Sequence, residues 1–404
     1  MTAPSPLAAP FPDRPMAAPA GSVALLGAGF PDLRIRAEAE TGAIVAVGQV
    51  VFRDARHPSI AFVSPIHGRV AAIEHGPRRV LSAFIIEPVA GQQVAAPVRS
   101  GDSVRAQMLD RGLWPALVAR PFGGPPDPEA SPDAIVVLAA PTSPTAPDPA
   151  TVLAKVLADR ADDFDVGLIA LTELTEGPVH LCVGKQWPRA VQDHPRLRVH
   201  RRRFGRRWQA KAAQVARAVG RGGASGRVWT IGYQDVAALG HLLRTGACDP
   251  LRTIAVSRPG GAQPETLRVP LGSSLGPLFG PVTGSPARLR STTGPSSERR
   301  WSLFLGRHDV EASLVPDLGP PPTGAPLRPL IPFNALDRPL PFGVPTVPLM
   351  RALTTGDRDA CARLGCLSLL PEDVAHLTDL CASGTDYGRR LAEILGQLRK
   401  DLST

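Results

Sequence analysis

The feature of this sequence most able to do chemistry is a run of basic residues between 196 and 211, which could bind an anionic partner. Its cationic members are Arg196, Arg198, Arg201, Arg202, Arg203, Arg206, Arg207 and Lys211. They supply +8 of a net charge of +9, with no acidic residue between them. With Phe204 and Trp208 interleaved, the run could contact anionic lipid, an acidic protein partner or nucleic acid, or form a solvated loop. Nucleic acid is the least expected partner because no groove-reading motif accompanies the run.

Two glycine motifs suggest phosphate binding or serine hydrolysis, but neither has the required context. Residues 220–226 (GRGGASG) follow a helical pattern and precede a strand, the reverse of a phosphate loop. Residues 272–276 (GSSLG) match the nucleophile elbow, yet Pro277 stands where a helix should follow. We expect connecting turns at both places.

The cysteines and histidines predict no metal centre. Cys361, Cys366 and Cys381 are separated by five and fifteen residues, which fits neither zinc nor iron–sulfur spacing. The nine histidines include no H-x-x-x-H pair. Five cysteines without a CxxC pair favour a reducing compartment. No general base, nucleophile and orienting residue occur together, so we predict no catalytic residue in this chain.

The elements that position these residues belong to a chain of 404 residues, long enough for two to four domains. Residues 1–20 contain six prolines, and we expect a disordered tail there rather than a signal peptide. The longest apolar run, residues 134–141, is too short to span a membrane, so no transmembrane segment is expected.

Residues 21–112 show short alternating strands punctuated by glycine, and they resemble the barrel-sandwich hybrid fold of biotinyl and lipoyl domains. The hairpin tip would be residues 53–59, which hold no lysine; the first lysine is Lys155. Attachment of biotin or lipoate is therefore excluded at this tip.

The remaining sequence predicts three further units, giving a multidomain α/β protein. Residues 113–262 alternate strands and helices, which indicates a parallel, Rossmann-like α/β domain that includes a strand at 253–257. Residues 263–325 resemble a soluble-ligand-binding β-grasp module. Residues 326–404 comprise a proline-rich linker and a helical domain.

Blocks of sequence spread over these units resemble the NqrA family. Its members are the A subunits of the Na⁺-translocating NADH:quinone oxidoreductases. The blocks occur in order at residues 23–27, 48–87, 110–122, 228–246 and 356–391. The resemblance is that of a divergent member, because the basic run and the proline-rich segment at 315–333 replace family segments. The family is related more distantly to the iron–sulfur protein RnfC.

The resemblance implies a peripheral subunit on the cytoplasmic side of the inner membrane, in a complex that transfers electrons from NADH to ubiquinone and transports sodium. It implies no tightly bound cofactor in this chain, with flavins and an iron–sulfur centre on partner subunits. The quinone-binding residues that it suggests are Leu26, Gly27, Phe30, Leu33, Arg120 and Phe122. Arg201, Arg202, Arg203, Arg206 and Arg207 would then face a partner or anionic lipid.

Two alternatives remain at this stage. The first is an RnfC-like electron-transfer subunit that binds flavin or NADH itself. The second is a binding module outside respiration that kept the fold.

Overall fold

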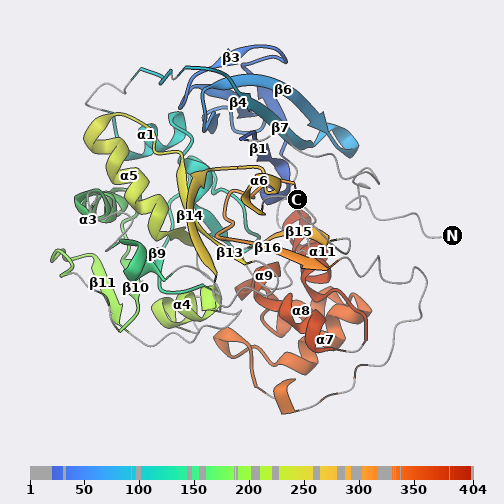
Figure 1. The fold of residues 1–404 in the computed structure, drawn as a ribbon. Helices are drawn as coiled ribbons and strands as arrows, with labels where there is room; N and C mark the ends of the chain where they lie inside the picture. The colour runs from blue at the N-terminus through green and yellow to red at the C-terminus, as the bar shows by residue number, and fades with distance from the viewer. Residues whose placement is uncertain are drawn as a thin grey trace.

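A computed structural model gives the fold. It describes residues 21–30, 33–91, 93–96, 102–142, 148–153, 161–185, 187, 190–201, 210–220, 227–257, 264–279, 287–292, 303–316, 330, 332, 334–336, 338–381 and 383–401. The N-terminal domain lies at the top of Figure 1 and the C-terminal helices at the bottom, with a small sheet between them.

The N-terminal domain consists of two small sheets. One has the order β1 (Val23–Leu26), β7 (Leu81–Pro88), β6 (Gly68–His75) and β3 (Ile44–Val45). The other has the order β2 (Ile35–Ala37), β4 (Val50–Asp54) and β5 (Ala61–Val63). Between them Phe52 stacks on Phe62, with ring centroids 4.6 Å apart, and lies 5.3 Å from Phe84. Burial of each ring stabilises the fold by about 1.5–3 kcal/mol. The tip expected at residues 53–59 is the β4–β5 connection.

The second domain is built on a five-stranded sheet. Its order is β11 (Leu197–Arg201), β10 (Val179–Val183), β9 (Ala134–Ala139), β12 (Val228–Gly232) and β8 (Val118–Arg120), and only β8 is antiparallel. Every residue of β9 is buried, as expected of a parallel strand covered on both faces. The alternation of side chains sends Ile135 and Val137 into one core and Val136 and Leu138 into another.

Helices cover both faces of this sheet. Helices α1 (Val104–Asp110), α3 (Ala161–Ala170) and α5 (Tyr233–Thr245) contribute to the core that holds Ile135, and α4 (Ala210–Val219) contributes Val215 to the other. The short α2 spans Pro149–Thr151. Helices α3 and α5 cross closely, since a Cβ on Gly240 would lie 1.6 Å from the backbone oxygen of Asp163.

A third sheet has the order β14 (Glu265–Pro270), β13 (Leu251–Ser257), β16 (Glu311–Pro316) and β15 (Ala287–Thr292). The placement of the strand at 253–257 in the α/β sheet was therefore wrong. It is part of β13, which pairs antiparallel with β14 and parallel with β16. Apolar periodicity identifies a strand but does not identify its partners. Helix α6 (Gly276–Phe279) follows β14, so a short helix does form across Pro277.

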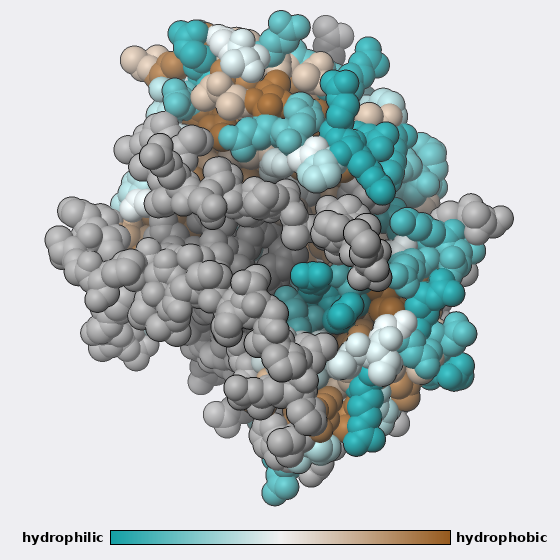
Figure 2. Space-filling view, turned by 90° about the vertical axis from the view of Figure 1, so that its right-hand side faces the viewer, coloured by the Kyte–Doolittle hydropathy of each residue, from teal (hydrophilic) through white to brown (hydrophobic). Residues whose placement is uncertain are grey.

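The C-terminal part is helical, as expected. Its helices are α7 (Thr346–Thr355), α8 (Arg358–Arg363), α9 (Pro371–Val374), α10 (His376–Leu380) and α11 (Tyr387–Asp401). Their buried side chains form a core of their own. On the face shown in Figure 2, hydrophilic side chains predominate among the coloured residues of the C-terminal part, and apolar ones form small patches. Among the described residues, no helix has both the length and the apolar character needed to cross a bilayer.

A buried ion pair joins the C-terminal helices to the α/β sheet. Arg120 at the end of β8 donates from both Nη atoms to Asp373 Oδ2, at 3.2 Å, and from Nη1 to the Ser368 carbonyl at 2.8 Å. The two side chains are 6% and 1% exposed. The same carboxylate oxygen accepts the Leu370 backbone N–H at 2.8 Å. Because removal of either partner would leave a buried charge uncompensated, the pair favours this placement of the C-terminal helices against the sheet.

Replacement of Asp373 by alanine should lower the free energy of unfolding by about 3–5 kcal/mol, because it leaves the Arg120 guanidinium buried without its counter-charge. The control is Asp401→Ala, which breaks the exposed Arg358–Asp401 pair and should cost less than about 1 kcal/mol. Urea unfolding measures both variants. Equal losses would show that the buried pair does not hold the interface.

Candidate functional site

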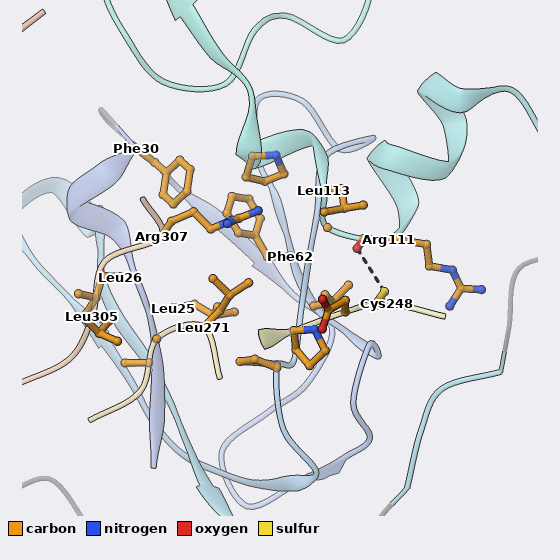
Figure 3. Close-up of a pocket in the computed structure, with 18 residues that line it drawn as sticks. Leu25, Leu26, Phe30, Phe62, Arg111, Leu113, Cys248, Leu271, Leu305 and Arg307 are labelled. Atoms are coloured by element: carbon orange, nitrogen blue, oxygen red, sulfur yellow. Dashed lines mark hydrogen bonds between the residues drawn. The ribbon is translucent and has the colours of Figure 1, made fainter. Parts of the chain in front are cut away.

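A recess opens where the N-terminal domain, the segment after α1 and the third sheet meet (Figure 3). The volume open to the centre of a water-sized sphere is about 60 Å³, and the space counted together with the opening to solvent is about 690 Å³. Its side chains are mostly apolar, and the charged residues in its lining are Arg111, Asp249 and Arg307. A mostly apolar concavity with a few polar groups at a domain junction is the usual form of a small-molecule site.

Aromatic and aliphatic residues of the N-terminal domain form one wall. Leu25 and Leu26 come from β1, Phe30 follows the 3-10 turn Gly27–Gly29, and Phe62 lies on β5. The Phe30 and Phe62 rings meet edge to face, with centroids 5.2 Å apart. Since Phe62 is also stacked on Phe52, this wall is fixed by packing.

A close backbone contact closes the recess on the side of β1. The Ala24 N–H donates to the Gly272 carbonyl at 2.8 Å. Gly272 has φ +75°, and a Cβ there would lie 2.2 Å from the Ala24 oxygen. The first glycine of the GxSxG match is therefore needed for packing. The Ser273 hydroxyl donates to the Pro270 carbonyl at 2.8 Å, in agreement with the expected turn.

A buried cationic cluster stands beside the recess. Asp235 on α5 accepts from Arg252 of β13 at 2.7 and 3.1 Å and from Arg307 Nη2 at 2.8 Å. Burial alone would raise the pKa of Asp235, but the two guanidiniums outweigh it and hold the pKa well below its usual range. The adjacent His308 is neutral at pH 7, because burial, with help from Arg307, lowers its pKa to about 3. Two positive charges thus share one carboxylate.

Cys248 supplies a thiol to the opposite side of the recess (Figure 3). Its Sγ lies 3.5 Å from the Arg111 carbonyl, to which it donates. Burial raises the pKa of this thiol to about 11, so it is protonated at neutral pH. A protonated, half-buried thiol acts here as an apolar lining group rather than a nucleophile.

The quinone-binding residues suggested by the sequence fall into two places. Leu26 and Phe30 line the recess. Gly27 begins the turn between them, and Leu33 is buried, with its carbonyl accepting the Leu81 N–H at 2.9 Å.

Arg120 and Phe122 are not in the lining of the recess. Arg120 is bound to Asp373, and Phe122, with φ +80°, packs against the C-terminal core. Phe62, Cys248 and Arg307 were not expected at this site from the sequence, because they come from distant segments that only the tertiary fold brings together.

The basic run is partly described. Arg198 and Arg201 are exposed on β11, the edge strand of the α/β sheet. Lys211 on α4 lies 4.0 Å from Glu372 of α9. Arg202, Arg203, Arg206 and Arg207 lie outside the described residues, as does the glycine-rich segment after Gly220.

Metal-binding groups are not assembled in the part of the chain that the structure describes. Within those residues no three side chains of His, Cys, Asp or Glu are placed to hold a metal ion. Cys361, Cys366 and Cys381 are free and buried in the C-terminal core.

Comparisons with known proteins agree with the first two domains. Residues 12–89 match the NqrA N-terminal barrel-sandwich hybrid domain, and residues 99–248 match the NqrA second alpha/beta domain. The chain is similar to the NqrA subunits of the Na(+)-translocating NADH-quinone reductases from Neisseria meningitidis serogroup A, with 29% identity, Shewanella amazonensis, with 30%, and Klebsiella pneumoniae, with 31%. Each similarity covers 94% of both chains.

The turn beside the recess allows a matched test of its packing. In Gly27→Ala the new Cβ would lie 1.9 Å from the Leu81 carbonyl oxygen, so we expect a loss of about 1–3 kcal/mol in the free energy of unfolding. Gly29→Ala, two residues along, meets nothing within 4 Å and should change it by less than about 0.5 kcal/mol. Thermal unfolding compares the two variants, and an equal effect would contradict the described contact.

Proposed function

This chain belongs to the NqrA family, and we propose that it acts as the NqrA subunit of a Na⁺-translocating NADH-quinone reductase. The observation that carries the proposal is the similarity to named NqrA subunits over 94% of both chains. No comparison favours the alternative of an RnfC-like subunit or of a module outside respiration.

The role that we assign to this chain is structural and quinone-binding. The recess beside Phe30 is the candidate quinone site, because its apolar and aromatic walls suit a substituted ring and an isoprenoid tail. Arg307 offers a donor to a ring oxygen. The quinone would be the electron acceptor of the reaction, and the residues of this chain would bind and orient the quinone.

The other elements of the complex belong to partner chains in this proposal. Flavins and the iron–sulfur centre would be carried by partner subunits, and this chain would sit on the cytoplasmic side of the inner membrane. The finer fold assignments are part of the same proposal: a Rossmann-like second domain, supported by its parallel strands, and a β-grasp relationship for the β13–β16 sheet, supported by its central parallel pair.

Deletion of this chain from its host should abolish sodium-stimulated NADH:quinone reductase activity in membranes, and the tagged chain should restore it. The tagged chain should also co-purify with flavin-bearing membrane proteins after gentle solubilisation. Recovery of the chain alone from the soluble fraction, with reductase activity unchanged by deletion, would refute the proposal. Membranes that carry an empty tag vector provide the control.

The basic run is the proposed contact with anionic lipid or an acidic partner. The triple variant Arg201→Glu, Arg202→Glu, Arg203→Glu should reduce retention of the chain on membranes by tenfold or more at about 0.15 M salt. The reason is that attraction to an anionic surface contributes about 1 kcal/mol per arginine. Lysine at the same three positions keeps the charge and should preserve retention. Sedimentation of membranes followed by immunoblotting measures both; equal retention of the two variants would exclude an electrostatic role.

A further inference from the structure

Arg307 has a donor that the fold leaves without an acceptor. Its side chain is 10% exposed, and its Nη2 is engaged by Asp235. Its Nη1 is buried without a hydrogen-bond partner among the described residues. Arg307 lines the recess, and in Figure 3 its side chain runs past Phe30 toward Phe62. A buried donor without a partner is costly, and in native proteins such a group normally has an explanation.

The charge balance around Arg307 also favours the binding of an acceptor group. Arg252 already engages both oxygens of Asp235, so Arg307 shares a carboxylate that is fully used. His308 adds no negative charge. The three groups Asp235, Arg252 and Arg307 therefore carry a net charge of +1 beside the recess. Low polarity around a cation strengthens its attraction for an acceptor oxygen.

The surroundings favour an organic ligand over a lone water molecule. Phe30, Phe62 and Leu305 contribute apolar side chains to the same recess, whereas a buried water needs two to four polar partners. Arg111 and Asp249 also line the recess, but Figure 3 places Arg111 on the side away from Arg307. The ligand that suits this end has a flat apolar body and an oxygen that only accepts.

We propose that Arg307 is the positioning residue for the quinone, with Nη1 donating to one ring carbonyl while the ring packs beside Phe30 and Phe62. The proposal rests on the quinone-binding role given above. Asp235 and Arg252 orient the guanidinium through their hydrogen bonds and ion pairs. Because arginine has donors and no acceptor, this end of the recess binds a carbonyl oxygen better than a hydroxyl, whose own proton would lack a partner. Arg307 thus selects the oxidised ring.

The experiment measures the affinity of the purified full chain for two ligands. Ubiquinone-1 has the ring carbonyls, and 2,3,4,5-tetramethoxytoluene has a similarly substituted ring with ether oxygens in their place. Arg307→Met removes all donors while keeping most of the side-chain length. We expect it to weaken ubiquinone-1 binding by about tenfold to a hundredfold, the value of a hydrogen bond to a charged group. Binding of the ether should weaken clearly less, because an aryl ether oxygen is a weaker acceptor than a quinone carbonyl and its methyl group hinders the approach of Nη1. Titration calorimetry and ligand-observed NMR give the dissociation constants.

Two further variants separate this role from a structural one. Arg307→Gln keeps a neutral donor and should fall between the wild type and the methionine variant for ubiquinone-1; it also decides the matter if the methionine variant does not fold. Arg244→Met removes an arginine from the Arg244–Asp163 pair outside the recess and should leave the affinity for both ligands unchanged. Melting temperatures are recorded for all variants.

Each outcome has a distinct meaning. A selective loss of ubiquinone-1 affinity supports the assignment of Arg307. Binding of ubiquinone-1 that does not depend on Arg307, or an equal loss for both ligands, overturns that assignment and leaves the quinone-binding role standing. If the wild-type chain binds ubiquinone-1 neither alone nor in the assembled complex, both the assignment and the quinone-binding role fail.

Discussion

The carboxylate of Asp235 is the constraint on which the arrangement around the recess depends. It lies on α5 of the α/β domain and binds Arg252 of β13 and Arg307 of the segment before β16. One buried anion therefore ties the third sheet to the α/β domain and sets the position of Arg307 in the recess. Removal of one member of such a cluster would leave an uncompensated buried charge, so the three side chains favour one mutual arrangement.

The other side of the recess is fixed by steric contact. Gly272 approaches β1 so closely that no side chain fits, and the turn at Gly27 presses on the Leu81 carbonyl. The aromatic wall of Phe30 and Phe62 is locked by stacking on Phe52. The recess thus has one wall that packing makes rigid and one wall that carries a buried positive charge. This combination suits orientation of a ligand, and the described residues beside it show no nucleophile activated by a base.

Local sequence signals predicted local structure well. Alternation and glycine spacing identified the sandwich strands and the tip between β4 and β5, and the apolar run at β9 identified a buried parallel strand. The strand at 253–257 was recognised but given the wrong sheet, since its partners β14 and β16 are set by tertiary contacts. Leu26 and Phe30, which the family resemblance suggested, line the recess, and their part in quinone binding stays a prediction. Arg307 was missed because its significance lies in its distant partner Asp235, a pairing that periodicity cannot reveal.

The central claim is that the recess between the three domains is the quinone site of an NqrA-family protein. Its most direct test is to irradiate the assembled complex with a photoreactive ubiquinone and map the labelled peptides by mass spectrometry, with excess ubiquinone as competitor. We predict competitor-sensitive labelling of peptides that contain Phe30, Phe62 or Arg307. Labelling of the partner proteins alone, or of this chain only at peptides remote from the recess, would contradict the account.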